Sequence, residues 1–264
     1  EGLVGAVVAV FSQFNSANYN GFKFDVVKDI KDGKFVLFTG TPCQCGAVRN
    51  LFKDAPDNLF LVDLICHGVP SLLSLQKHVV SKIGSIHAER VLFRDGTLMG
   101  LTLVSKNGEI LYNKPLSSRY KDEYFNAFFD GYSYRDSCYS CQYAKPERAF
   151  DITIGDFWGL GKKIPATEIP QHPNGCSVIL PSSPKGVELA HAIQESMNMY
   201  PREVDEAVDG NDQLQHPYYL NRRIKLYRSL VRFGLGTWVY KLCVADKMLK
   251  LKLIPIWKKL KKNG

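Results

Sequence analysis

Four of the seven cysteines lie in three short motifs, and their type and spacing could do chemistry. The motifs are Gly40-Thr41-Pro42-Cys43-Gln44, Cys66-His67-Gly68 and Cys138-Tyr139-Ser140-Cys141. A Cys-x-x-Cys pair can direct both of its sulfurs at one metal ion or cluster. Four thiolates gathered from three segments therefore predict a metal or iron–sulfur site, and they indicate a protein that moves electrons.

Spacing alone leaves zinc and iron–sulfur both open. A zinc ribbon normally brings two Cys-x-x-Cys pairs, whereas Cys43 and Cys66 each stand alone in the sequence. That distribution favours a cubane cluster held between a strand–helix unit and a loop. The alternative is that Cys43 and Cys66 are buried packing residues, as free cysteines often are. The three other cysteines are expected to be structural: Cys45, Cys176 and Cys243.

Two apolar strands and the helix between them must position the first two cysteines. Residues 34–39 and 58–65 are short apolar runs that read as buried strands, and residues 44–52 read as a helix. A strand–helix–strand unit favours parallel pairing. Cys43 and Cys66 would then follow the carboxyl ends of adjacent strands, where open α/β sheets place their sites.

The remaining pattern predicts an α/β fold with a mixed sheet, a Cys-bearing loop and a basic helical C-terminal tail. The Asn107-Gly108 pair predicts a hairpin turn. We expect an α/β domain over residues 1–219 and an amphipathic tail over residues 220–264. Further strands are expected at 90–94, 98–105, 109–115, 151–154 and 177–180, and further helices at 71–83, 121–129 and 184–199.

Composition and cysteine usage indicate a cytoplasmic protein. With 45% apolar and 23% charged residues, the chain has the composition of a globular domain. No secretory leader opens the sequence, and clustered cysteines in such a chain are typically metal-binding rather than bridged. The chain begins with Glu1 rather than Met, and residues 1–10 read as a strand. We therefore expect a fragment of a longer protein.

The net charge of +8 comes from the C-terminal tail. Residues 220–264 hold 13 Lys and Arg against one acid, a net of +12, which leaves the rest at −4. Residues 238–262 mix Lys with Leu, Ile and Trp, a pattern that suits an anionic membrane surface at the inner face of the membrane. It equally suits a peripheral helix that packs on its own domain. The net-acidic body argues against nucleic-acid binding.

The segment Gly155-Asp156-Phe157-Trp158-Gly159 follows a predicted strand and can line a flat cofactor. Glycine permits a close approach, and an aromatic side chain can cover a ring face. The alternative is a capped strand end with a half-buried Trp158. Arg94 can supply positive charge to a diphosphate or to an anionic cluster, although such a residue is more often a plain surface charge.

Four segments together resemble the coenzyme F(420) hydrogenase/dehydrogenase beta-subunit family, in the family's order and over about residues 30–185. They are FTGTPCQ (38–44), DLICHGVPS (63–71), FRD (93–95) and CYSCQY followed by DITIGDFWG (138–143 and 151–159). The resemblance implies an oxidoreductase that passes electrons between a [4Fe-4S] cluster beside FAD and an organic acceptor. It also implies a redox partner that carries iron–sulfur centres, such as a ferredoxin-like protein or module.

Carried over by motif, the resemblance implies specific roles for these residues. The cluster ligands would be Cys43, Cys66, Cys138 and Cys141, and the cofactor-lining residues would be Thr41, Arg94, Gly155, Asp156, Phe157 and Trp158. Relatives usually carry a glycine-rich stretch and a Ser-Lys-Tyr segment before the GTPCQ motif, and both help to hold flavin. Neither is found here, which weakens the expectation of FAD. The alternative from another class is a structural zinc-binding interaction module with a membrane- or partner-binding tail.

Overall fold

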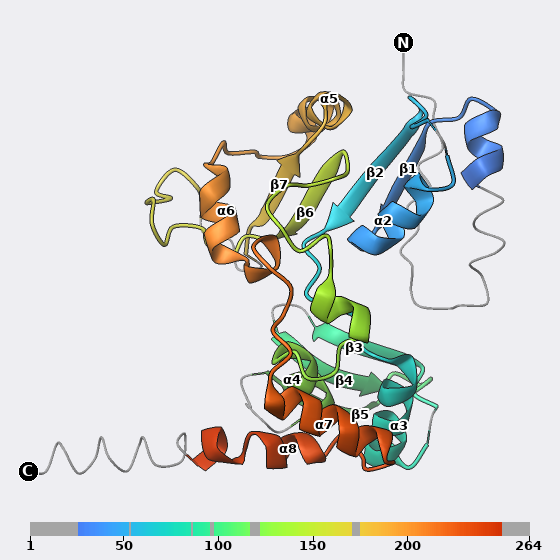
Figure 1. Ribbon diagram of the computed structural model, residues 1–264, viewed down its shortest axis with the longest axis vertical. Coiled ribbons are helices and arrows are strands. Elements are labelled where there is room, and N and C mark those ends of the chain that lie inside the picture. Colours follow the sequence, from blue (N-terminus) through green and yellow to red (C-terminus); the bar gives the residue numbers. More distant parts are fainter. Residues whose placement is uncertain are drawn as a thin grey trace, which may run out of the picture. The chain divides into compact units, whose positions relative to one another are not determined.

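The computed structural model describes residues 26–52, 54–85, 87–95, 98–116, 122–170 and 175–249 (Figure 1). The chain forms two compact units, and each is made of two separate stretches. The first unit holds residues 1–67 and 141–217, and the second holds residues 68–140 and 218–264. The strand expected over residues 1–10 and the tail from residue 250 onward lie outside the described residues.

The first unit is built on a four-stranded sheet in the order β1-β2-β6-β7. Strands β1 (Val36–Gly40), β2 (Leu59–Leu64) and β6 (Ile152–Asp156) are parallel, and β7 (Ser177–Pro181) runs antiparallel to β6. Helix α2 (Pro42–Arg49) lies between β1 and β2 in the chain. The predicted parallel strand–helix–strand unit and the mixed sheet are therefore confirmed.

Apolar side chains on both sides of this sheet form the core of the first unit. β2 is buried along five of its six residues, as expected for a central parallel strand. Helices α5 (Pro184–Ile193) and α6 (Val204–Gly210) follow β7, and short 3-10 turns follow each of them at Gln194–Ser196 and Asp212–Leu214. The predicted helix over 184–199 is thus shorter than expected. The cluster beside β1 and β2 consists of Val26, Val36, Phe38, Cys45, Val48, Leu59, Leu61 and Phe150.

The second unit has its own sheet, which is antiparallel throughout, in the order β3-β4-β5. Its strands are β3 (Arg90–Asp95), β4 (Leu98–Val104) and β5 (Ile110–Pro115). Gly108 has a φ of +83° in the β4–β5 connection, which explains why the predicted Asn-Gly turn forms there. Helices α3 (Leu72–Ile83) and α4 (Glu123–Phe129) complete this part of the unit.

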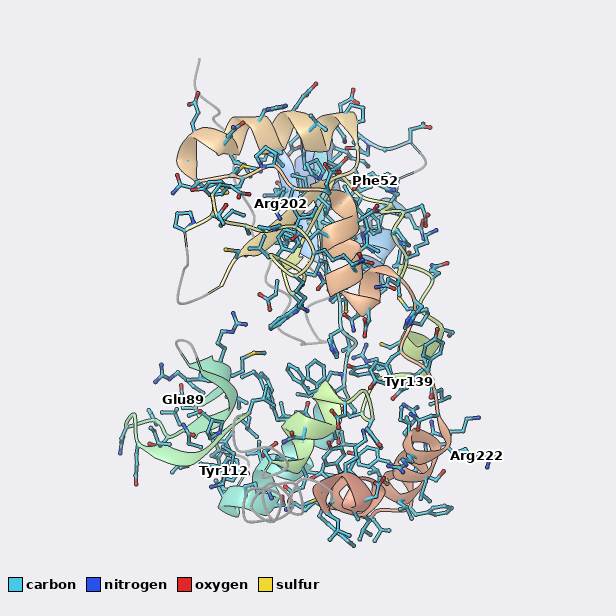
Figure 2. All side chains as sticks on the ribbon, turned by 90° about the vertical axis from the view of Figure 1, so that its left-hand side faces the viewer. Phe52, Glu89, Tyr112, Tyr139, Arg202 and Arg222 are labelled. Atoms are coloured by element: carbon cyan, nitrogen blue, oxygen red, sulfur yellow. The ribbon has the colours of Figure 1, made fainter. Side chains whose placement is uncertain are left out.

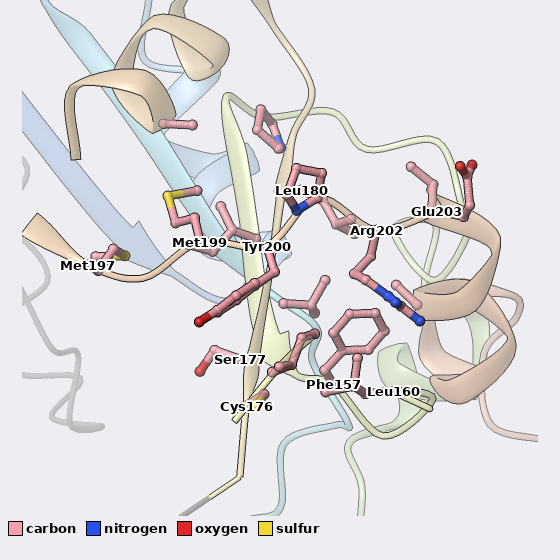
Figure 3. A pocket seen from close by; sticks show the side chains of 18 of the residues that line it. Phe157, Leu160, Cys176, Ser177, Leu180, Met197, Met199, Tyr200, Arg202 and Glu203 are labelled. Atoms are coloured by element: carbon pink, nitrogen blue, oxygen red, sulfur yellow. The ribbon is translucent and has the colours of Figure 1, made fainter. Parts of the chain in front are cut away.

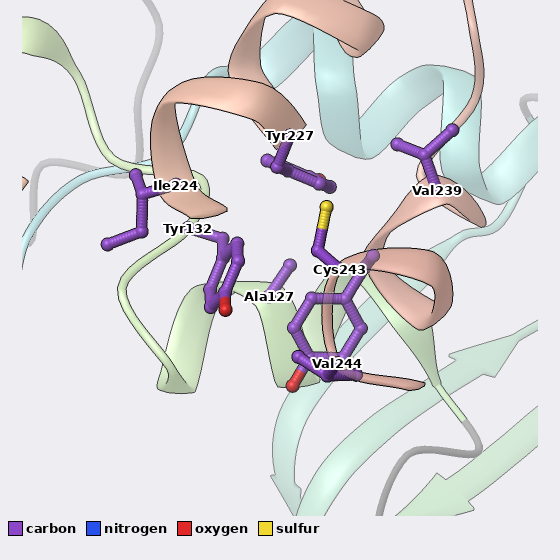
Figure 4. Packing of buried hydrophobic residues seen from close by; sticks show 8 residues of the cluster. Ala127, Tyr132, Ile224, Tyr227, Val239, Cys243 and Val244 are labelled. Atoms are coloured by element: carbon purple, nitrogen blue, oxygen red, sulfur yellow. The ribbon is translucent and has the colours of Figure 1, made fainter. Parts of the chain in front are cut away.

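The first helices of the predicted tail belong to the core of the second unit. Helices α7 (Arg222–Arg232) and α8 (Val239–Cys243) bury side chains against Ala127 and Tyr132 (Figure 4). Tyr132 meets Tyr227 and Tyr240 edge to face, with ring centroids 5.7 and 5.3 Å apart. The structure thus divides the chain differently from the predicted boundary at 219/220. That residues 1–219 work as one functional domain stays a prediction.

A buried hydrogen-bond network joins the helices of the second unit. His78 Nε2 lies 2.8 Å from the Asp122 carboxylate, and His78 Nδ1 lies 2.7 Å from the Thr237 hydroxyl. The Tyr112 hydroxyl donates to the same carboxylate at 2.9 Å (Tyr112 is labelled in Figure 2). The network secures the segment before α8 to α3 and α4.

Within the described part of the chain, no helix is both long and apolar enough to span a bilayer.

Candidate functional site

The three parallel strands of the first unit end at one edge, and candidate residues follow each of them. In the register of the sheet, Gly40 of β1 is paired with Asp63 of β2, and Asp63 is paired with Thr153 of β6. Cys43, Cys66 and Asp156 each come three residues after one of these partners. The prediction that Cys43 and Cys66 follow the carboxyl ends of adjacent parallel strands is confirmed, and the Gly155–Trp158 segment begins at the same edge.

Cys43 lies in the first turn of α2, where the sequence fixes the start of the helix. Pro42 occupies the first helical turn, where its missing N–H leaves no hydrogen bond unmade. The Gln44 side chain accepts a hydrogen bond of 2.9 Å from the Thr41 N–H. The Thr41 hydroxyl lies 3.2 Å from the Cys43 sulfur. Cys43 is exposed, so its thiol is available to a ligand.

Cys66 follows β2 in a half-buried segment. The Ile65 N–H donates a hydrogen bond of 2.8 Å to the Ile154 carbonyl, which holds this segment beside the end of β6. A side chain at Gly155 would begin 2.8 Å from the Ile65 side chain, so glycine permits this close approach. Burial lowers the pKa of the neighbouring His67, and Asp212 opposes that effect.

The segment after Cys141 is fastened to the sheet by a buried ion pair. Arg148 bonds to the Asp63 carboxylate, and their side chains are only 5% and 0% exposed. Arg148 also donates to the Thr153 hydroxyl at 2.9 Å and to the Tyr143 carbonyl at 2.7 Å. Burial raises the pKa of Asp63, while Arg148 and the Thr153 hydroxyl act against this. Arg148 therefore connects the Cys141 segment to β2 and β6.

The Gly155–Trp158 segment presents its two aromatic side chains differently. Trp158 is half exposed, whereas Phe157 packs against the Val178–Ala207–Leu214 cluster. Phe157 also lines a mainly apolar cavity of about 700 Å³ beside β7, α5 and α6 (Figure 3). Cys176, Tyr200 and Arg202 are among its other lining residues. A cavity of this size is within the range of small-molecule sites.

Cys138 belongs to the second unit, where helix α7 holds the turn that carries it. Cys138 lies in a 3-10 helix, η2 (Asp136–Ser140). Arg228 of α7 bonds to the Asp136 carboxylate and to the Tyr134 carbonyl, and its guanidinium lies 5.0 Å from the Tyr139 ring centroid. The Tyr139 hydroxyl donates to the Gly131 carbonyl at 2.7 Å (Tyr139 is labelled in Figure 2). The basic helix thus supports the turn that carries Cys138.

The predicted site residues divide between the two units. The first unit contains Thr41, Cys43, Cys66, Cys141 and residues 155–158; the second contains Cys138 and Arg94, which is exposed on β3. Sequence reasoning missed Arg148, Asp63 and Arg228, because nothing in the sequence marks an ion pair between residues 85 positions apart. The sulfurs of Cys43, Cys66 and Cys141 do not all lie within 4.8 Å of one another.

The seven cysteines are all free thiols, and they differ in how deeply they are buried. Cys45 is fully buried, and its sulfur lies 3.8 and 3.6 Å from the carbonyls of Gly40 and Val62. Burial raises the pKa of the Cys45 thiol well above its usual range, and Cys243 is buried in the core of the second unit. Each candidate ligand is more accessible than Cys45 and Cys243: Cys43, Cys66, Cys138 and Cys141.

Comparison with known proteins identifies the family of this chain. The family model for the C-terminal part of the coenzyme F(420) hydrogenase/dehydrogenase beta subunit matches residues 33–207. No curated protein matched the chain. Among solved structures, a chain of the F(420)-reducing [NiFe] hydrogenase complex from Methanosarcina barkeri is similar at 20% identity and a TM-score of 0.39. The similarity covers 79% of this chain and 66% of that one, just under two thirds of its length. The family match extends over most of the first unit and the sheet of the second, and the chain belongs to the coenzyme F(420) hydrogenase/dehydrogenase beta-subunit family.

Proposed function

We propose that this protein is an iron–sulfur oxidoreductase that passes electrons between a [4Fe-4S] cluster and an organic acceptor. The observation that carries the proposal is the carboxyl edge of β1, β2 and β6. It brings the Cys43 and Cys66 segments beside the start of the Gly155–Trp158 segment in one unit. Family membership supports the same assignment.

The thiols present suit an iron–sulfur cluster. Cys43 is exposed and Cys66, Cys138 and Cys141 are partly exposed, so none of these four thiols is enclosed in a hydrophobic core. A tetrahedral zinc ion with Zn–S bonds of about 2.3 Å needs its sulfurs about 3.8 Å apart. The choice of a cluster over zinc rests on family membership and is decided by the metal analysis described below.

The chain's own residues would hold and tune this cluster. A bound cluster supplies one-electron transfer, and hydrogen bonds to its sulfurs help to set its potential. The Thr41 hydroxyl lies 3.2 Å from the Cys43 sulfur and donates to Gln44 Oε1 at 3.0 Å, and it could donate to a Cys43 thiolate by turning away from that oxygen. Arg148 and Asp63 would keep the Cys141 segment in place against β2 and β6.

FAD is the second cofactor in this proposal, beside the Gly155–Trp158 segment with Thr41 and Arg94 as further contacts. Flavins interconvert one- and two-electron chemistry, which suits transfer from a cluster to an organic acceptor. Its support is the family resemblance; of the six proposed contacts, Phe157 alone lines the cavity of about 700 Å³. The half-exposed Trp158 offers a ring face to a flat cofactor.

The proposal also includes a partner and a location. The electrons would come from a redox partner with iron–sulfur centres, such as a ferredoxin-like protein or module. The reaction would take place in the cytoplasm, with the protein peripheral to the inner face of the membrane. Its support is the cysteine chemistry and the basic charge of residues 220–264.

Purification without oxygen, followed by metal, sulfide and flavin analysis, tests the proposal. We expect a brown protein with about four iron and four acid-labile sulfides per chain, whose colour bleaches with dithionite. Released FAD, identified by its fluorescence, would support the flavin. A colourless protein that contains one zinc ion would overturn the proposal in favour of a structural zinc module. Iron and sulfide without flavin would overturn only the FAD part.

A further inference from the structure

One side of the chain around α8 presents a continuous apolar stripe to solvent. Trp238, Leu242 and Leu249 are 50%, 60% and 60% exposed, and Ala245 between them is also exposed. Their spacing of four, three and four residues is that of one helical face. Helix α8 ends at Cys243 and a turn at Val244 separates it from helical residues 245–249, and the stripe stays exposed on both sides of this turn. In the sequence the same spacing continues with Leu253, Ile256 and Leu260, which lie outside the described residues.

The opposite side of the same segment packs in the hydrophobic core of the second unit. The exposed stripe is therefore separate from the side that forms the core. Val239, Tyr240, Cys243 and Val244 are buried against Tyr132 and Tyr227 (Figure 4). Met248 packs against the same cluster. Two apolar sides therefore exist on this segment, and among the described residues of the second unit only one of them packs against a core. Large exposed apolar patches on proteins commonly mark interaction surfaces.

Positive charge is concentrated in the same stretch of the chain. Residues 218–249 contain seven Lys and Arg and one acid, Asp246. Four of the seven are paired with carboxylates of the second unit: Arg223, Arg228, Arg232 and Lys241. Arg222, Lys225 and Lys247 are exposed and have no ion pair within the described residues. Phe233, 86% exposed, lies in the turn between α7 and α8.

We infer that this surface docks on a bilayer that contains anionic lipids, with Trp238, Leu242 and Leu249 at the headgroup–acyl boundary. The inference deepens the proposed peripheral location, on which it rests, and it is independent of the iron–sulfur chemistry. An interfacial helix combines Trp, Phe and Leu on one face with Lys and Arg around it. The exposed Trp and Leu side chains, in a stretch of chain rich in Lys and Arg, fit this pattern, and an acidic protein is an outcome that the test distinguishes. A bilayer surface satisfies both groups at once.

Co-sedimentation of the full-length chain with lipid vesicles tests this inference. One set of vesicles contains phosphatidylcholine alone, and the other contains equal parts of phosphatidylcholine and phosphatidylglycerol. We expect binding to the anionic vesicles that weakens with salt, and little binding to the neutral ones. The double variant Trp238→Ser/Leu242→Ser should bind at least about tenfold more weakly, because both side chains leave water on docking. Arg222→Gln/Lys225→Gln should also weaken binding by about tenfold.

Leu73→Ser is the matched control, because Leu73 is an exposed apolar residue on α3 of the same unit. It should bind as the unaltered chain does. Equal binding by Trp238→Ser/Leu242→Ser would overturn the assigned surface but leave the peripheral location intact. Absence of binding to either vesicle would overturn both. A dimer in light scattering that the double variant disrupts, or binding to polyglutamate with no binding to vesicles, would overturn the inference in favour of a second copy or an acidic protein.

Discussion

Arg148 extends from the segment after Cys141 to the carboxylate of Asp63, a side chain with no exposed surface at the end of β2. Asp63 also accepts a hydrogen bond from Thr153 of β6. Arg148 and Asp63 thus connect β2, β6 and the segment that follows Cys141. A buried pair of this kind gives little net stability, but the loss of one partner is costly.

The first prediction concerns this ion pair. Arg148→Ala leaves the Asp63 carboxylate buried without a cation, and we expect it to lower the free energy of unfolding by about 3–5 kcal/mol. Urea unfolding followed by circular dichroism measures the change. Lys163→Ala is the matched control, because it removes an exposed pair with Asp209 and should cost less than about 1 kcal/mol. Similar losses in the two variants would show that Arg148 has no special role.

The second prediction separates the cysteines by role. Cys66→Ser and Cys138→Ser should each lose most of the bound iron and sulfide of the anaerobically purified protein, because an alcohol is a poor ligand for iron–sulfur clusters. Cys176→Ser should retain the full content. Cys176 is the appropriate control because it is also a partly exposed free thiol, but it lies beside β7 in the Phe157 cavity. Full iron content in Cys66→Ser would remove this residue from the ligand set.

The third prediction tests whether helix α7 supports the Cys138 turn. Arg228→Ala removes the bonds to Asp136 and Tyr134 and the contact with the Tyr139 ring. We expect a reduced iron content and an altered visible spectrum, together with a stability loss of about 1–3 kcal/mol. Arg232→Ala is the control, because Arg232 bonds to the same Asp136 at 3.0 Å but is 69% exposed. If both variants keep the spectrum of the unaltered protein, α7 does not position the turn.

Most helices and strands could be predicted from neighbouring residues in the sequence, whereas contacts between distant residues could not. The Asn107-Gly108 turn and the Ser71 start of α3 depend on neighbouring residues, and both form as expected. The same holds for the strand–helix–strand unit around Cys43, where Pro42 and Gln44 start the helix. The division into two sheets depends instead on which strands pair, and periodicity does not reveal pairing.

The packing of the C-terminal region could not be predicted from the sequence either. Its excess of Lys and Arg suggested a separate tail, but Ile224, Tyr227, Val239 and Tyr240 fill the core of the second unit. Charge composition describes the exposed side of a helix and says little about its buried side. The candidate cysteines were predictable because their motifs are local, whereas Arg228, which supports the Cys138 turn, is 90 positions from Cys138 in the sequence.

The fourth prediction concerns the pH dependence of stability through Glu123. Burial alone would raise the pKa of this carboxyl, but hydrogen bonds from Lys241 and Lys82, at 2.5 and 2.7 Å, hold the pKa at about 2, below its ordinary value of 4.5. A carboxyl with a lowered pKa in the folded state stabilises the fold above its unfolded pKa. This contribution, up to about 3 kcal/mol, should therefore be complete above pH 4.5 and be lost as the pH falls toward 2.

Glu123→Gln tests this prediction, because the amide cannot ionise. At neutral pH the variant should be less stable than the unaltered protein, and the difference should shrink as the pH approaches about 3. Urea unfolding at a series of pH values measures it. Glu109→Gln, which removes an exposed carboxylate near the β4–β5 turn, should change the free energy of unfolding by less than about 0.5 kcal/mol. A Glu123→Gln difference that stays constant across this range would show that the two lysines do not stabilise the charged form, since only an ionising carboxylate couples their contacts to pH.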